Sequence, residues 1–144
     1  MSITRNNPNT VFLGGDRTVV NDLETSAILT PGMLVERAIN AGVVRWKLAT
    51  ADIAGPSAVC TDQSMVNKGV DDNYAVGDLV EVSILHKGAV AWCLIASGQN
   101  VAVGNLLGSA GDGTLKTGAT VARFTALESK PTVQALTRIR VEAL

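Results

Sequence analysis

The stretch Val43–Leu48 reads Val-Val-Arg-Trp-Lys-Leu, in which apolar and charged side chains alternate from Val44 onward. Successive side chains of a β-strand point to opposite faces of a sheet, so Val44, Trp46 and Leu48 share one face and the two cations lie on the other. A strand with one apolar face and one charged face has a core on one side and water on the other. The stretch therefore predicts a half-buried strand of the antiparallel type.

The same period recurs along the rest of the chain. Residues 80–85 repeat it, and residues 138–143 end the chain with Ile139 and Val141 on one face and charged side chains on the other. Residues 89–96 are apolar on both faces, which is typical of a central strand covered on both sides. Residues 33–39, 106–109 and 121–127 are further strand candidates, and helix is expected only as one turn at 132–137.

Turn residues separate these segments at spacings that suit short strands far better than helices. Asp112-Gly113 stands between two short apolar runs and predicts a hairpin, because Asp and Gly tolerate the positive φ of tight hairpin turns. The sequence thus predicts an all-β fold, one small compact domain. The apolar phase of the strands predicts a core of Val44, Trp46, Leu48, Val82, Ile84, Trp92, Leu94, Phe124, Ile139 and Val141.

Composition narrows the classes of function. The 144 residues carry 12 Lys and Arg against 13 Asp and Glu, and only 3% are Phe, Trp or Tyr. Nucleic-acid binders usually carry a basic surplus, and single-strand binders also use aromatic stacking platforms, so no nucleic acid is expected as a partner. With 47% hydrophobic residues the chain can bury a core. No run approaches the length of a membrane span, and residues 1–7 lack the apolar core of a signal peptide, so neither a membrane partner nor export by that route is expected.

Residues able to carry chemistry are few. Cys60 and Cys93 lie 33 positions apart without a CxxC pair, which suits a reducing compartment, and Cys93 sits in an apolar run that indicates a small buried hydrophobe. The single histidine, His86, precedes Lys87-Gly88 and is interpreted as a solvated turn residue. One histidine cannot build a histidine-rich zinc site within one chain. We therefore expect no catalytic residues, no metal site and no cofactor.

Three further motifs have a structural and a functional reading. Residues 71–73, Asp-Asp-Asn, lack the remaining ligands of a calcium loop and indicate an acidic turn. Gly108 and Gly113 have the separation of a phosphate-binding loop, but Thr114 stands where that motif requires lysine. Arg138 and Arg140 share one strand face, where they either bind an anion or solvate the surface, with the second interpretation favoured.

The first 27 residues differ in composition from the rest, being rich in Asn, Thr and Asp. Ordering a backbone costs about 1–2 kcal/mol per residue, and this segment has few apolar groups to offset that cost. It is therefore predicted to be an extended N-terminal arm (1–27) that precedes the β domain (28–144) and becomes ordered on a partner. The candidate contacts of the arm with that partner or with a neighbouring subunit are Val11, Phe12, Leu13, Thr18, Val19 and Val20.

Several motifs, taken in order and spacing, resemble the tailed-bacteriophage capsid decoration proteins, also called cement or head-stabilising proteins. The resemblance covers most of the chain from about Ile28 onward. It rests on ILTPGMLVE (28–36), GVDDNYAVGDLVEV (69–82), GQNVAVG (98–104), GDGTL (111–115) and RIRVE (138–142).

The resemblance implies a β-barrel or β-tulip-like protomer, usually trimeric, that binds the outside of the expanded phage head and stabilises it against the pressure of packaged DNA. The implied partners are the major capsid protein and further copies of the chain in a homotrimer. The implied location is the capsid exterior of the virion, after synthesis in the host cytoplasm. The residues also leave open a small β-barrel module that binds a ligand or nucleic acid, and, as the weakest candidate, a hydrolase.

Overall fold

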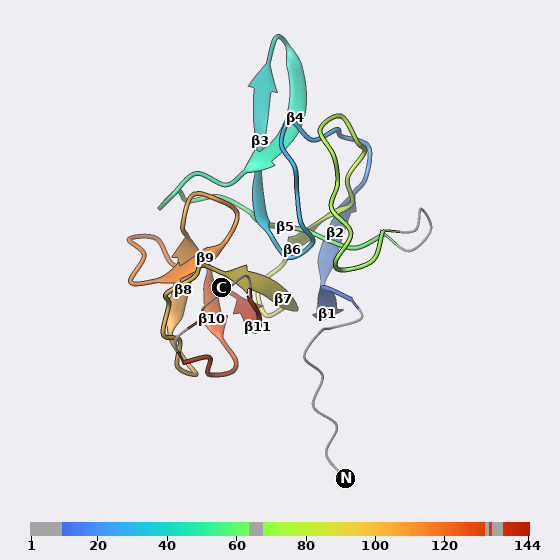
Figure 1. The fold of residues 1–144 in the computed structure, drawn as a ribbon. Coiled ribbons are helices and arrows are strands. Elements are labelled where there is room, and N and C mark those ends of the chain that lie inside the picture. Colours follow the sequence, from blue (N-terminus) through green and yellow to red (C-terminus); the bar gives the residue numbers. More distant parts are fainter. Residues whose placement is uncertain (1–9, 64–67, 132, 134–136) are drawn as a thin grey trace.

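The computed structural model describes residues 10–63, 68–131, 133 and 137–144, and in these ranges the chain is all-β (Figure 1). None of the described residues form a helix that could cross a membrane. Eleven strands build two sheets that share a core. They are β1 (Phe12–Gly14), β2 (Arg17–Val20), β3 (Leu34–Asn40), β4 (Val43–Leu48), β5 (Ser57–Cys60), β6 (Val82–Leu85), β7 (Val90–Ile95), β8 (Leu106–Ser109), β9 (Leu115–Thr117), β10 (Phe124–Ala126) and β11 (Thr137–Ala143).

The first sheet closes into a five-stranded barrel. Its strands follow the order β7-β11-β10-β8-β9, and β9 returns to β7 through one parallel pairing, Ile95 with Leu115. The other pairings in the barrel are antiparallel. The free half of the same β7 edge accepts β1, which adds a sixth strand to the sheet. The prediction of a small β-barrel is confirmed.

The second sheet has the order β2-β6-β5-β3-β4 and packs with one face on the barrel. Leu34, Val59 and Leu85 point to the core shared with the barrel. Their sequence neighbours Val35, Ala58 and Ile84 point to the opposite face and belong to a second apolar cluster around Trp46 and Tyr74. The sheet is therefore covered on both faces near β5, in which all four residues are buried.

The predicted strands were found with small shifts at their ends. The segments expected at 43–48, 106–109 and 138–143 correspond to β4, β8 and β11, and Asp112-Gly113 does join two antiparallel strands, β8 and β9. Only the last part of the segment 121–127 is a strand, β10. The helical turn expected at 132–137 lies largely outside the described residues, and Thr137 begins β11.

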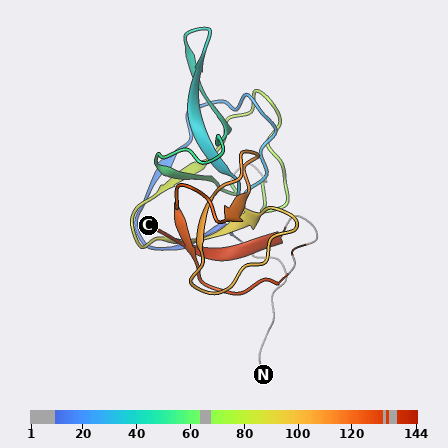
Figure 2. The same cartoon turned by 90° about the vertical axis from the view of Figure 1, so that its left-hand side faces the viewer.

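Six of the ten predicted core residues are buried, and four are not. Leu48 and Ile84 are only partly buried, against the cluster around Trp46. Trp46, Val82, Leu94, Phe124, Ile139 and Val141 are all buried. Val44, however, is 38% exposed, because the β3–β4 hairpin extends past the rest of its sheet and nothing described covers its outer half (Figure 2). Trp92 is only half-buried, because the face of β7 that carries it lies near the surface. The β7 segment is thus fully buried on the Ala91, Cys93 and Ile95 side alone.

The expectation of an arm outside the β domain is wrong for residues 10–27. β1 pairs with β7 of the barrel, and β2 pairs with β6 along four residues of the second sheet. Val11 is completely buried in the shared core, and its backbone N–H donates to Asp62 Oδ1 at 2.8 Å. The composition argument failed because strand pairing with β6 and β7 satisfies the backbone of this polar segment, so few apolar side chains are needed.

The chain crosses from one sheet to the other at Gly15, between β1 and β2. Gly15 has φ of +93°, and a Cβ there would lie 2.7 Å from the Cα of Ala89. Only glycine accepts both the left-handed conformation and this approach of the β6–β7 turn. The glycine therefore allows the N-terminal segment to place β1 in the first sheet and β2 in the second, which connects the two sheets.

Candidate interaction surfaces

The two cysteines and the single histidine are the candidate chemical residues of the chain. No group of three or more His, Cys, Asp or Glu side chains within the described ranges is close enough to bind an ion. Cys60 and Cys93 are free thiols that are fully buried, and burial raises the pKa of both, that of Cys93 to about 12. A buried thiol that stays protonated is a poor nucleophile. His86 is an exposed turn residue whose Nε2 lies 2.9 Å from the hydroxyl of Thr18.

The acidic turn at 71–73 and Arg138 form one structural unit. The side chain of Arg138 is 8% exposed and its guanidinium donates to the carbonyl oxygens of Pro31 and Val70. A third contact joins Arg138 Nη1 to Asp71 Oδ1 at 3.0 Å. The guanidinium is thus occupied by partners from two loops, so Arg138 fastens these loops to β11 and does not present a free anion site.

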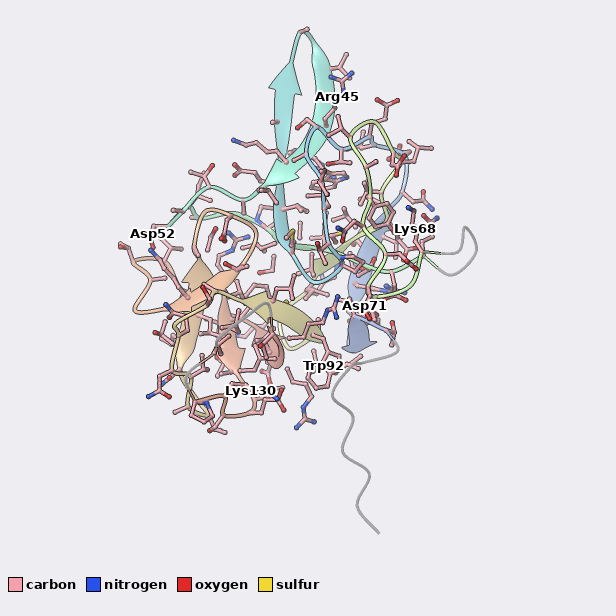
Figure 3. All side chains as sticks on the ribbon, in the orientation of Figure 1. Arg45, Asp52, Lys68, Asp71, Trp92 and Lys130 are labelled. Carbon is pink, nitrogen blue, oxygen red and sulfur yellow. The ribbon has the colours of Figure 1, made fainter. Side chains whose placement is uncertain are left out.

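Arg140 is the exposed neighbour on the same face of β11. Its Nε lies 3.6 Å from Glu128 Oε2, and its guanidinium carbon lies 5.9 Å from the centre of the Trp92 ring. Trp92 itself lies at the lower end of the molecule as drawn (Figure 3). Both arginines therefore have carboxylate partners in the structure. The exposed Arg140 agrees with the interpretation that these arginines solvate the surface, whereas the buried Arg138 does not.

A pocket of about 300 Å³ opens where β3 and β5 part, because β3 pairs with β5 only through Leu34 and Val35. Apolar side chains from both strands and from Ile53 line it, together with the charged residues Glu36, Arg37 and Arg123. The guanidinium of Arg37 lies over the Trp46 ring at 5.1 Å. The pocket is therefore an apolar recess with a charged rim.

Two buried donors beside this pocket lack an acceptor among the described residues. They are Trp46 Nε1 and Arg123 Nε. Burial lowers the pKa of Arg123, the charge of Glu36 acts against that shift, and the guanidinium donates to the carbonyl oxygens of Ile53 and Pro56. Neither unpaired N–H has appreciable exposed surface, so a molecule in the pocket would not reach it without a rearrangement. The pocket thus offers apolar contact more than directed hydrogen bonds.

The loop that borders the pocket is held to the barrel by Asp52. Its two carboxylate oxygens accept from Lys116 Nζ at 3.0 Å and from the backbone N–H of Thr120 at 2.9 Å. These hydrogen bonds, the one from Lys116 first, lower the pKa of Asp52. The residue adopts a positive φ of 53°, and it lies at the side of the molecule away from the 71–73 turn (Figure 3). The contact fixes the loop without creating a chemical site.

The six candidate contact residues of the N-terminal segment divide into buried and exposed sets. Val11 belongs to the core, Phe12 lies half-buried under the guanidinium of Arg17 at 4.2 Å, and Val20 packs against the cluster around Trp46. Three remain at the surface: Leu13, Thr18 and Val19, of which Leu13 and Val19 are among the exposed large hydrophobic residues. Contact of these three with a capsid or subunit stays a prediction.

The outer half of the β3–β4 hairpin is an exposed apolar surface that was not predicted from the sequence. Ile39 is 77% exposed and is paired across the hairpin with Val44, while Val43 on the other face is also exposed. The available signal was an apolar residue on each side of the turn at 40–42, where solvent-exposed hairpin ends usually carry polar side chains. The alternation places Val44 in the predicted core and assigns no role to Ile39.

Comparison with known proteins gives a likeness in fold. No protein-family profile matches the sequence, and no curated protein matches it. Among solved structures, the chain is similar to the N base of the head fiber protein gp8.5 of bacteriophage phi29, with a TM-score of 0.57 and 13% sequence identity. The match covers 90% of this chain and 97% of that chain. At this identity the match shows a shared fold over nearly the whole length of both molecules.

Proposed function

We propose that this chain is a structural protein of a tailed-phage head, bound to the outside of the capsid as a decoration or cement protein that stabilises the expanded head. The observation that carries the proposal is the fold likeness to the base of a phage head fiber along 90% of the chain. The resemblance of several sequence motifs to decoration proteins is separate support for a role on the phage head. Because the fold alone does not determine function, the proposal needs a direct test.

The surface of the described residues supports a binding role without chemistry. The two thiols are buried, His86 lies in an exposed turn beside the hydroxyl of Thr18, and the arginines at β11 have carboxylate partners. Exposed apolar side chains occur instead on β1, β2 and the β3–β4 hairpin. Large exposed hydrophobic residues are typical of contact with another protein when they cluster. The proposed partners are the major capsid protein and further copies of the chain in a homotrimer.

The proposed capsid contact uses the exposed side chains of the first two strands, Leu13, Thr18 and Val19. Because β1 and β2 are built into the two sheets, such a contact would attach the whole folded domain and not a flexible tether. In a trimer three equal contacts act together, and the effective concentration of the second and third contacts raises the overall affinity. Modest contacts on each protomer are then sufficient for saturated decoration.

The test is co-sedimentation of the purified protein with expanded phage heads that lack it. Leu13→Lys/Val19→Lys places charge on the proposed contact, whereas Val103→Lys changes another exposed apolar residue elsewhere on the surface. The wild type and Val103→Lys are expected to sediment with heads to a fixed ratio, and Leu13→Lys/Val19→Lys to stay in the supernatant. A wild-type protein that does not sediment with the heads would contradict the head-bound role.

The second candidate function is a ligand-binding β-barrel module, and the recess between β3 and β5 is the observation that favours it. A pocket of this size beside a tryptophan suits a small apolar molecule. The fluorescence of Trp46 in a Trp92→Phe variant would respond to such a molecule, because Trp46 lines the recess. An unchanged spectrum with a panel of small apolar ligands would remove this candidate.

A further inference from the structure

The outer half of the β3–β4 hairpin has two unpaired backbone edges. β3 pairs with β5 only through Leu34 and Val35, so its outer edge from Glu36 to the turn has no strand beside it among the described residues. The outer edge of β4 is covered at Trp46 by the backbone of residues 24–26, and it is free from Val43 to Arg45 within the same described part. Free strand edges on both sides of one hairpin are templates for pairing with another strand.

The side chains on this outer half are apolar where a monomer would carry polar groups. Ile39 and Val44 are cross-strand partners on one face, and Val43 is exposed on the other face. The one charged side chain between Val43 and Arg45 is Arg45 itself, whose Nε lies 3.7 Å from Glu24 Oε2. The hairpin end therefore combines unpaired backbone with an uncharged face.

We infer that this hairpin is a contact between copies of the chain, in which the outer edge of β3 in one copy pairs with the outer edge of β4 in the next. The two edges are unlike, so each copy offers one of each kind, and a head-to-tail contact of this type closes into a ring when the rotation between copies is a whole fraction of a turn, as in a trimer. Residues 38–40 of one copy would face residues 43–45 of the next.

The symmetry of the ring fixes the register between copies. Rotation about an axis parallel to the hairpin does not shift a residue along that axis, so residues that are cross-strand partners within one hairpin are also partners between neighbouring copies. Ile39 would meet Val44 of the second copy, as it already meets Val44 of its own chain. On the opposite face, Arg45 of the second copy would stand across from the small side chain of Ala38. The edges are thus complementary in register and in apolar character.

A second copy fits these observations better than a different protein. The hairpin itself supplies both an unpaired β3 edge and an unpaired β4 edge, with apolar side chains at matching positions. The inference rests on the proposed function only for the number of copies, which is three. The contact itself is tested with purified protein in the absence of heads, so its failure and the failure of head binding are separate results.

The first experiment is light scattering across a dilution series. The wild type is expected to have three times the mass of one 14.9 kDa chain. Ile39→Lys/Val44→Lys should fall to the mass of one chain, since both positions are exposed and the change places like charges against each other in the ring. Val103→Lys, at an exposed apolar residue outside the hairpin, should keep the wild-type mass. A monomeric wild type, or an unchanged mass in the double variant, would overturn the inference.

The second experiment tests the same contact in case the double lysine variant loses mass only because it misfolds. Ile39→Cys and Val44→Cys are prepared separately, mixed and oxidised, while the native thiols stay buried. The mixture is expected to give cross-linked dimers that join position 39 of one copy to position 44 of another, and each variant alone should give few. Dimers that join 39 to 39 as readily would mean that the hairpins meet about a two-fold axis, which contradicts the pairing of unlike edges.

Discussion

Arg138 shows how one buried cation organises several loops. Its guanidinium is shared by the carbonyl oxygens of Pro31 and Val70 and by the carboxylate of Asp71. Arg138→Ala would leave these acceptors without a donor, and a buried group that loses its partner costs about 1–3 kcal/mol. We expect the free energy of unfolding to fall by about 2 kcal/mol. Urea unfolding followed by circular dichroism measures it.

The neighbouring Arg140 provides the matched control for that prediction. It lies on the same strand with a side chain that is 48% exposed and an ion pair to Glu128 at 3.6 Å. Exposed ion pairs contribute about 0–1 kcal/mol. Arg140→Ala should therefore change the free energy of unfolding far less than Arg138→Ala. Equal losses in the two variants would mean that the contacts of Arg138 are not what holds the loops.

Glu36 gives the fold a dependence on acid pH. Partial burial raises the pKa of Glu36, but hydrogen bonds from Thr50 and from Lys47, with the charge of Lys47, outweigh it, so the pKa lies below its ordinary value. A depressed folded pKa stabilises the fold above the unfolded value, about 4.3, and this stabilisation is lost as pH falls through the folded pKa. Glu36→Gln should therefore be less stable than the wild type at neutral pH, with a gap that narrows in acid.

The measurement is urea unfolding of both proteins from pH 7 downward. Glu142→Gln removes one exposed carboxylate charge from β11 and serves as the matched control. If the gap between wild type and Glu36→Gln were the same at neutral and at acid pH, the hydrogen bonds of Glu36 would not be the source of the stabilisation.

Single residues were predicted well where alternation alone decides burial. Ile139 and Val141 on β11 are buried as the pattern requires, because that strand lies within a closed barrel. The same pattern failed at Val44, since alternation says which face is apolar but not whether another layer covers it. The role of Arg138 was equally out of reach, because its partners come from loops 67 and 107 positions away in the chain.

At the scale of the strand, the N-terminal segment is part of the core. Val11, just before β1, is completely buried, while Val19 on β2 is 42% exposed. Removing two buried methyl groups costs roughly 2 kcal/mol, at about 0.8 kcal/mol per buried carbon with an added cavity cost. Val11→Ala is expected to lower the free energy of unfolding by about that amount. Thermal and urea unfolding measure the loss.

Val19→Ala is the control for this element, because exposed substitutions usually change stability by less than about 0.5 kcal/mol. A Val11→Ala protein as stable as the wild type would restore the interpretation of the segment as an arm that is dispensable for folding. The head-binding assay separates the two roles, since Val19→Ala is expected to weaken binding while leaving the fold intact.

Elements with clear alternation were predictable, and so was the longer apolar run of β7, whereas some short strands were not. β4 and β11 were found because each has one apolar face. β5 was not identified because its four residues, Ser57–Cys60, are buried on both faces and so show no alternation. β1 and β2 were attributed to an arm because their stability comes from pairing with β6 and β7, which local composition does not reveal.

At the scale of the molecule, the fold class could be predicted, but the arrangement of the two sheets could not. A barrel closed by a single pairing of Ile95 with Leu115 depends on contacts between strands far apart in the sequence. The projecting hairpin follows from the same arrangement, since it exists only because β5 pairs with two residues of β3. The candidate contact residues are therefore exposed side chains of ordered strands, whereas the sequence predicted them on an extended arm.

The central claim is that this folded domain binds the outside of a phage head. Cryo-electron microscopy of heads of a phage that encodes the chain, imaged without the protein and after its addition, tests this claim most directly. The account predicts added density on the outer capsid surface, in groups of three, each part of which accommodates the barrel, the second sheet and the projecting hairpin. Heads that look the same with and without the protein, or density confined to the interior, would contradict it.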